Sequence, residues 1–221
     1  MNLAMPRRLR LCLTLCWLAL PAAAQTWTEV RSPHFIVLTD AGRDAGRNVA
    51  LRFEQMRQTF GSILQKPVVR AGVPLNIIAF KTTRALQTAL PHHPQAAGLF
   101  VSAADADYVL LDLSAPDPYA ALARDYAHSV IVANTPPLPL WYDVGMAEYF
   151  STINVGSKDV QLGRRPAFVD DALATGKLMP AAVFLGLDRT SSEYKQGDAT
   201  FRAQCWLMVS WLMANRQLGG Q

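Results

Sequence analysis

Two short segments of the chain carry side chains that could bind a metal or activate water. The first contains Asp125 and His128, which are three residues apart and therefore share one face if the segment is a helix. The second contains Glu148, in an apolar stretch that follows several prolines. Imidazole and carboxylate groups are zinc ligands, and zinc lowers the pKa of a bound water to roughly 7. Asp125, His128 and Glu148 are therefore one candidate zinc-binding set.

The five residues that begin at Arg124 partly match the HExxH pattern of zinc peptidases. In the HExxH pattern, histidines at i and i+4 point from one helix face to the same metal, and the glutamate after the first takes a proton from the bound water. A third ligand, often a glutamate on a following helix, completes the site. The pentad here reads Arg124, Asp125, Tyr126, Ala127 and His128, so only the second histidine is present.

Two helices on either side of a loop must position these residues. The pattern predicts a helix over 118–133 that carries the pentad, and a helix around 144–151 that carries Glu148. Pro136, Pro137 and Pro139 predict a loop between them, because proline interrupts helices. A metal or an ion pair in this region would thus join two separate helices.

The rest of the chain predicts strands first and helices afterwards. A helix that Thr39 or Asp40 could cap carries an apolar stripe at helical spacing, formed by Val49, Phe53, Met56, Phe60 and Leu64. Apolar and β-branched runs predict strands at 35–38, 75–80, 98–102 and 108–113, an extended piece at 160–162, and further helices at 82–90, 167–174 and 199–215. This order indicates an α+β fold rather than a doubly wound sheet.

Several longer phrases give the chain a family resemblance. They are WTEVRSPHFIVLTDAG at 27–42, the pentad helix, PPLPLWYDVGMAEYFST at 136–152, LGRRP at 162–166 and FRAQCW at 201–206. With these phrases the chain resembles the bacterial DUF1570 group of peptidase MA-like proteins, relatives of the gluzincin-type zinc metallopeptidases. The resemblance implies a gluzincin (zincin-like) fold: a small mixed sheet whose edge strand borders a cleft, an active-site-type helix, and a C-terminal helical lobe.

The resemblance also implies which positions once held the metal. Arg124 stands at the first ligand histidine, Asp125 at the general-base glutamate, and His128 at the second ligand. Val144 stands at the third ligand, a glutamate in the family pattern, whereas Glu148 corresponds to a structural carboxylate beyond it. Three of these four catalytic positions are altered.

The altered side chains predict loss of the metal and of hydrolysis. Arginine stays protonated and valine has no lone pair, so neither Arg124 nor Val144 can bind zinc. One imidazole does not hold catalytic zinc, which needs three protein ligands. We therefore expect a non-catalytic pseudopeptidase without cofactor, whose cleft binds a peptide, a partner protein or nothing specific. The alternative is an active zinc-dependent hydrolase with a rebuilt site of Asp125, His128 and Glu148.

Arg124 is expected to take over part of the structural role of the metal. If it projects into the former zinc cleft, it needs a carboxylate partner, because an unpaired buried charge is costly. Asp125, Asp143 and Glu148 are the candidates. We hypothesise that such a pair links the two helices, and that His128 is a packed or hydrogen-bonded histidine.

The first 24 residues predict export. They contain Arg7, Arg8 and Arg10, an apolar run over 11–20, and small residues before Gln25, which are typical of a secretory signal peptide. The run is too short for a membrane span, and no cysteine has a lipoprotein context, so we expect a periplasmic or extracellular protein without a stable membrane anchor. We expect 25–221 to be a single domain; relatives often continue further, so an alternative is a truncated or decaying homologue.

Removal of this segment changes the charge and the cysteine count. It takes away three of the 21 Lys and Arg, leaving 18 against 17 Asp and Glu, so the charge does not indicate nucleic-acid binding. It also takes away Cys12 and Cys16, which leaves Cys205, predicted to be a buried core thiol. His34 is expected to be structural, His92 and His93 to lie in an exposed loop, and Ser191 and Ser192 in a polar turn.

Overall fold

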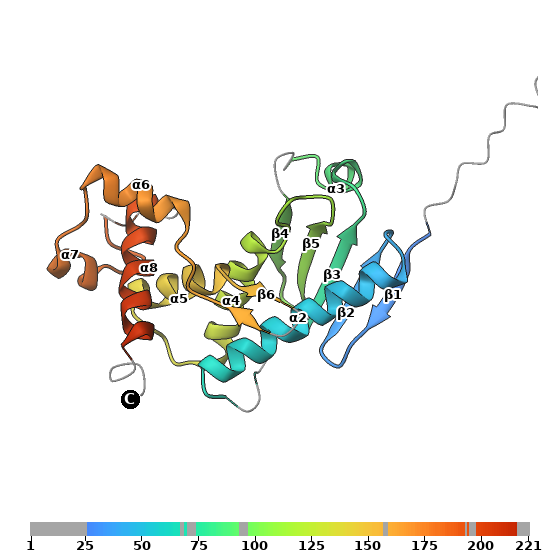
Figure 1. The fold of residues 1–221 in the computed structure, drawn as a ribbon, viewed down its shortest axis with the longest axis horizontal. Coiled ribbons are helices and arrows are strands. Elements are labelled where there is room, and N and C mark those ends of the chain that lie inside the picture. The colour runs from blue at the N-terminus through green and yellow to red at the C-terminus, as the bar shows by residue number, and fades with distance from the viewer. Residues whose placement is uncertain are drawn as a thin grey trace, which may run out of the picture.

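A computed structural model describes residues 26–66, 69, 74–92, 97–156, 159–192, 194 and 198–215. A mixed sheet lies toward one end of the molecule and a group of helices toward the other (Figure 1). The strands are β1 (Thr28–Arg31), β2 (Phe35–Thr39), β3 (Leu75–Phe80), β4 (Gly98–Ser102), β5 (Asp107–Asp112), β6 (Asn154–Val155) and β7 (Val160–Gln161). The helices are α2 (Arg43–Ile63), α3 (Thr83–Ala89), α4 (Ala120–Asn134), α5 (Leu140–Ser151), α6 (Ala167–Thr175), α7 (Ala181–Gly186) and α8 (Ala199–Ala214). The predicted α+β class is confirmed.

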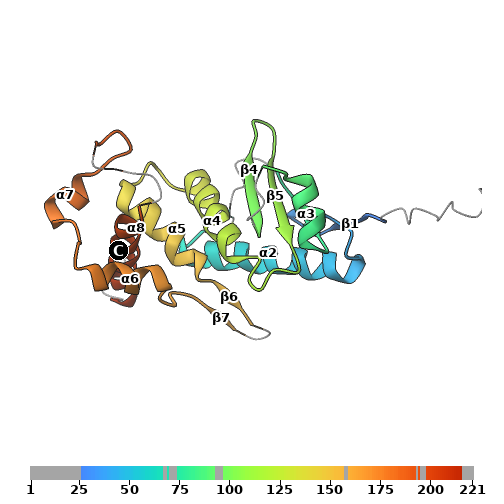
Figure 2. The ribbon, with the colours of Figure 1, turned by 90° about the horizontal axis from the view of Figure 1, so that it is seen from above.

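The main sheet has the strand order β1-β2-β3-β5-β4. Strands β2, β3 and β5 are parallel, and the two outer strands, β1 and β4, run antiparallel to their neighbours. Strand β4 is the outer strand on the side of α4, which packs against it (Figure 2). The prediction of a small mixed sheet is therefore confirmed, and its edge strand lies next to the helix that carries the pentad.

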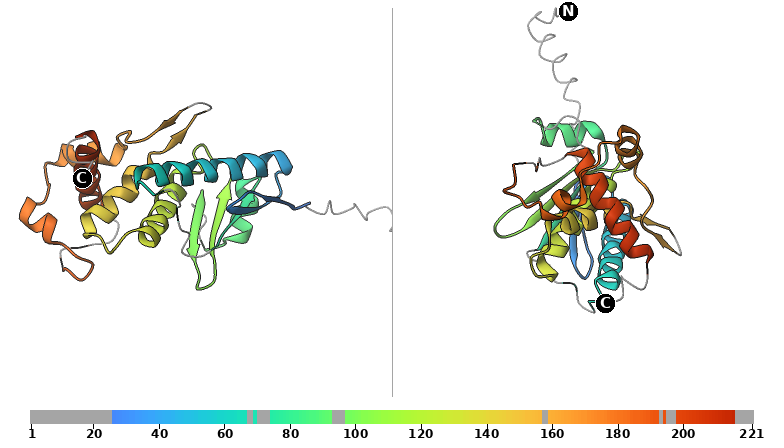
Figure 3. Two further views of the ribbon diagram at one scale, coloured as in Figure 1. Left: turned by 90° about the horizontal axis from the view of Figure 1, so that it is seen from below. Right: turned by 90° about the vertical axis from the view of Figure 1, so that its left-hand side faces the viewer.

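One face of the sheet forms the main core with α2 and α4. Val37, Ile77 and Val109 face one another across the three parallel strands and are completely buried. The apolar stripe predicted for α2 covers this face, and the left view of Figure 3 shows α2 lying across one side of the sheet. Phe53 of α2 contacts the ring of Tyr126 on α4, with 5.7 Å between the ring centroids. The core thus holds α4 in a defined orientation over the sheet.

The C-terminal helices form a lobe around α5. Helix α5 packs against both α4 and α8, and α6 packs against α8. Gly145 permits the close approach of α5 and α8, because a Cβ at this position would lie 2.5 Å from the carbonyl oxygen of Cys205. Cys205 itself is buried, as predicted, and burial raises the pKa of its thiol. Helix α5 is therefore the element that joins the sheet-bearing part to the helical lobe.

Several element boundaries differ from the prediction. Strand β1, helix α7 and the short β6 were missed, and α5 begins at Leu140 rather than near Val144. The predicted capping of α2 by Thr39 or Asp40 is wrong, because the cap residue is Gly42. Asp40 instead accepts the backbone N–H of Lys81 at 2.6 Å, and Thr39 accepts that of Ala41. Thr39 thus stabilises a local turn and Asp40 bonds a backbone group 41 residues away, so neither side chain caps α2.

Candidate functional site

A cleft of about 310 Å³ lies where α4, α5 and α8 meet. Arg124, Asp125 and His128 line it from α4, and Val144, Ala147 and Glu148 line it from α5. The remaining lining residues are Arg189, Tyr194, Phe201 and Arg202. The structure thus brings together Arg124, Asp125, His128 and Val144, the four positions for which the family resemblance implied a zinc site, with Glu148 beside them.

Helical spacing explains why these residues share one cleft. Arg124, Asp125 and His128 occupy i, i+1 and i+4 of α4, and Val144 and Glu148 occupy i and i+4 of α5. Residues four apart lie above one another on a helix face. The extensive packing of α4 on α5 then turns these two faces toward the same space.

Glu148 lines this cleft from α5 and is held by Arg202 of α8. Its side chain is only 3% exposed. Arg202 donates from Nε to Oε1 at 2.6 Å and from Nη2 to Oε2 at 3.1 Å, which is a bidentate ion pair. The hydrogen bond to Glu148 raises the pKa of the Arg202 guanidinium above its ordinary value, although burial opposes it. The guanidinium also lies over the ring of Phe168, 4.6 Å from its centroid. Both Glu148 oxygens are therefore already engaged.

Asp143 joins α4 and α5 through the one histidine that survives from the pentad. The His128 Nδ1 atom lies 2.9 Å from Asp143 Oδ1. Arg189, in the turn after α7, donates from Nη2 to Asp143 Oδ2 at 2.8 Å. His128 is thus a hydrogen-bonded histidine, as predicted, and its partner lies on the other helix of the cleft.

Arg124 forms a weaker link between the helices than the sequence suggested. Its Nη2 lies 3.1 Å from Asp125 Oδ1 on the same helix, and its Nη1 lies 3.8 Å from Glu148 Oε1. The Arg124 side chain is 39% exposed, so water screens this longer contact. Of the three candidate partners, Asp125 and Glu148 lie within ion-pair distance of Arg124, whereas Asp143 pairs with His128 and Arg189. The shortest ion pair of Glu148 is the one with Arg202, which links α5 to α8.

The residues of the cleft do not fit a zinc ion. Among the described residues, no group of three or more His, Cys, Asp or Glu side chains is arranged to hold a metal. In the alternative set of Asp125, His128 and Glu148, each member already has an ionic or hydrogen-bonding partner, and Glu148 has a bidentate one. Metal binding by that set would require the Arg202 pair to open.

Two charged residues of the cleft, Arg189 and Arg202, were not identified from the sequence. Arg202 lies within the phrase FRAQCW, but its spacing from Glu148 gives no local signal. Arg189 lies in a turn whose position depends on α7, which was also missed. The three arginines of the cleft face three carboxylates, Asp125, Asp143 and Glu148, so its formal charges cancel when histidine is counted as neutral.

The other residues considered for chemistry have structural surroundings. The Nδ1 atom of His34 lies 2.7 Å from Glu54 Oε2, which makes it a structural histidine as expected. His92 is exposed, whereas His93 lies outside the described residues. Ser191 donates to Asp188 within a turn.

Comparisons with known sequences and a survey for membrane spans add little to this picture. Neither a scan against protein-family models nor a search of curated proteins finds a match for this chain. In the part of the chain that the structure describes, every helix is too short or too polar to cross a membrane.

Proposed function

We propose that this protein is a non-catalytic relative of the zincin-like metallopeptidases, whose cleft binds an extended peptide or protein segment without zinc. The order of its elements supports this: a mixed sheet with an antiparallel edge strand is followed by two helices that carry the altered motif. The proposal includes export, for which the first 24 residues are the support.

The observation that carries the proposal is the content of the cleft. The positions expected for two zinc ligands hold Arg124 and Val144, which cannot coordinate zinc. The buried carboxylate beside them, Glu148, is neutralised by Arg202. A protein that tethers its helices with ion pairs in this way keeps the cleft without needing the metal.

The peptide would bind along β4, which packs against the cleft-lining helix α4 although no β4 residue lines the cleft itself. Strand β4 is at the end of the sheet order, so its outer edge is not paired within the described sheet. Strand addition at such an edge uses main-chain hydrogen bonds and requires no metal. The cleft could then receive a side chain of the same peptide.

Reversion of the three altered positions tests the loss of zinc. The variant Arg124→His, Asp125→Glu, Val144→Glu is expected to bind about one zinc per chain, because the changes at 124 and 144 restore two ligands that complete a set of three with His128. The natural protein, purified after its first 24 residues are removed, should contain far less. Metal content is measured by mass spectrometry of the purified proteins.

A fourth substitution controls this experiment. His128→Ala added to the revertant should abolish the gained zinc, which separates binding in the cleft from binding at the surface. Stoichiometric zinc in the natural protein, lost to a chelator together with peptide cleavage, would overturn the proposal in favour of a rebuilt active site.

Binding of unfolded polypeptide tests the positive part of the proposal. Val144→Trp should weaken the binding of fluorescently labelled, denatured casein several-fold, because the larger side chain fills the cleft. Fluorescence anisotropy measures the affinity. Val160→Trp, at an exposed position of β7, is the matched control and should bind as the natural protein does. Equal affinity of both variants, or no binding by the natural protein, would contradict a peptide-binding cleft.

A further inference from the structure

A second cavity lies beneath the sheet, on a different face of α4 from the cleft. Its volume is about 100 Å³. Phe35, Leu75 and Asp107, at the starts of the three parallel strands, line it together with Tyr126 and Ser129 of α4. The cleft uses Arg124, Asp125 and His128 of the same helix. The two sites are thus separate, although one helix contributes to both.

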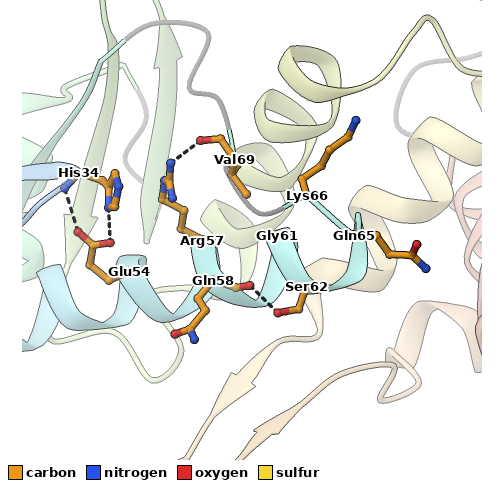
Figure 4. A pocket seen from close by; sticks show the side chains of 9 residues that line it. All are labelled: His34, Glu54, Arg57, Gln58, Gly61, Ser62, Gln65, Lys66 and Val69. Carbon is orange, nitrogen blue, oxygen red and sulfur yellow. Dashed lines mark hydrogen bonds and ion pairs between the residues drawn. The ribbon is translucent and has the colours of Figure 1, made fainter.

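This second cavity, called the inner cavity from here on, adjoins a wider depression along α2. The depression has a volume of about 670 Å³, and it shares His34, Arg57 and Val69 with the inner cavity. Figure 4 shows His34 held by Glu54, and Arg57 pointing to the backbone carbonyl of Val69. The two hollows are therefore neighbours that share a wall of anchored side chains.

Asp107 is the unusual residue of the inner cavity. It is only 6% exposed, yet among the described residues its carboxylate receives one hydrogen bond, from Ser129 Oγ to Oδ2 at 3.3 Å. An ionised carboxylate has two oxygens that together accept about four hydrogen bonds. A buried carboxylate with so few donors is costly unless another group supplies them. Asp107 therefore indicates a ligand that donates hydrogen bonds and carries positive charge.

We propose that this cavity binds a primary ammonium group at the end of a short aliphatic chain. An ammonium group offers three donors and the opposite charge to Asp107. Phe35, Leu75 and Val130 supply apolar walls for the aliphatic part. A water molecule occupies about 30 Å³ of liquid, so the cavity has space for only a few heavy atoms.

The other charged groups around the cavity are compatible with a cation. Glu54 is held by Ser32 and His34, and Arg57 donates to a neutral carbonyl. With histidine counted as neutral, one carboxylate and one guanidinium line the inner cavity among the described residues, and Arg57 is directed to the Val69 carbonyl rather than to Asp107. Burial raises the pKa of Tyr126, so its hydroxyl remains a neutral donor and acceptor.

The ammonium group could belong to a free alkylamine or to a lysine side chain of a peptide, and two ligands distinguish these sources. Propylammonium chloride represents the free amine, with 1-propanol as its neutral match. A short peptide with one central lysine represents the side chain, with the same peptide acetylated at that lysine as its match. Binding is measured by calorimetry and by NMR titration of the natural protein.

We expect at least one of the two charged ligands to bind more tightly than its neutral match. Asp107→Asn should weaken that binding by at least about tenfold, because it removes the charge from a buried pair. Asp44→Asn, which changes an exposed aspartate of α2, is the matched control and should have no effect. Ser129→Ala provides a milder second variant if Asp107→Asn does not fold, and should weaken binding several-fold.

Three outcomes would overturn the proposal. They are equal binding of charged and neutral ligands, full affinity in both the Asp107 and Ser129 variants, and a crystal structure soaked in propylammonium chloride that shows only water beside Asp107. Val144→Trp should leave ammonium binding unchanged, so the result does not depend on the function proposed for the cleft.

Discussion

Replacement of Glu148 by alanine is expected to lower the free energy of unfolding by about 3 kcal/mol or more. Glu148 is 3% exposed and forms a bidentate pair with Arg202, whose side chain is 26% exposed. Removal of one partner of a buried pair leaves the other charge without compensation, which costs more than the pair itself contributes. Urea denaturation at neutral pH measures the change.

Two variants separate this effect from simple truncation. The double variant Glu148→Leu, Arg202→Leu should recover part of the lost stability, because neither charge is left unpaired. Arg124→Ala should cost only about 0.5 to 1 kcal/mol, since Arg124 is partly exposed and its nearest contact to Glu148 is 3.8 Å. A larger loss for Arg124→Ala than for Glu148→Ala would show that Arg124, not Arg202, links the helices.

Gly145→Ala is expected to destabilise the protein by about 2 kcal/mol, despite the better helix propensity of alanine. The added Cβ would lie 2.5 Å from the carbonyl oxygen of Cys205 and 2.6 Å from Cγ2 of Val209. The first contact is with backbone, so α5 and α8 would have to move apart. Because these helices also carry Glu148 and Arg202, the same change should lengthen the ion pair that closes the cleft. Thermal and urea unfolding measure the loss.

Gly186→Ala is the matched control for this prediction. Gly186 ends α7, and a Cβ there would meet no atom within 4 Å. We expect its free energy of unfolding to change by no more than about 0.5 kcal/mol. If both glycine variants were equally stable, α5 and α8 would not be in close contact at Gly145.

Local patterns in the sequence were sufficient for most elements and for half of the cleft. The buried strands β3 and β5, the apolar stripe of α2, and the two helices around the proline loop are all encoded by residues a few positions apart. The grouping of Arg124, Asp125, His128 and Val144 followed from helical spacing and a family resemblance. Such signals come from residues close in sequence, so they can be recognised without knowledge of the fold.

Strand β1 and helix α7, which were not predicted from the sequence, lack such local signals. Strand β1 has only four residues with a mixed polar pattern, and it forms by pairing with β2. Helix α7 has six residues and is stabilised by Phe184, which packs in a small cluster with Phe201. Their conformations depend on neighbours that the sequence does not place.

The sequence by itself determined the class of fold and the two helices that carry Arg124, His128 and Val144, because short-range patterns encode them. Only the tertiary structure decided what neutralises the carboxylates of the cleft. Glu148 and Arg202 are 54 residues apart, and Asp143 and Arg189 are 46 apart. No periodicity spans such distances; these pairs form because α8 and the turn after α7 pack against α5, which depends on the whole helical lobe.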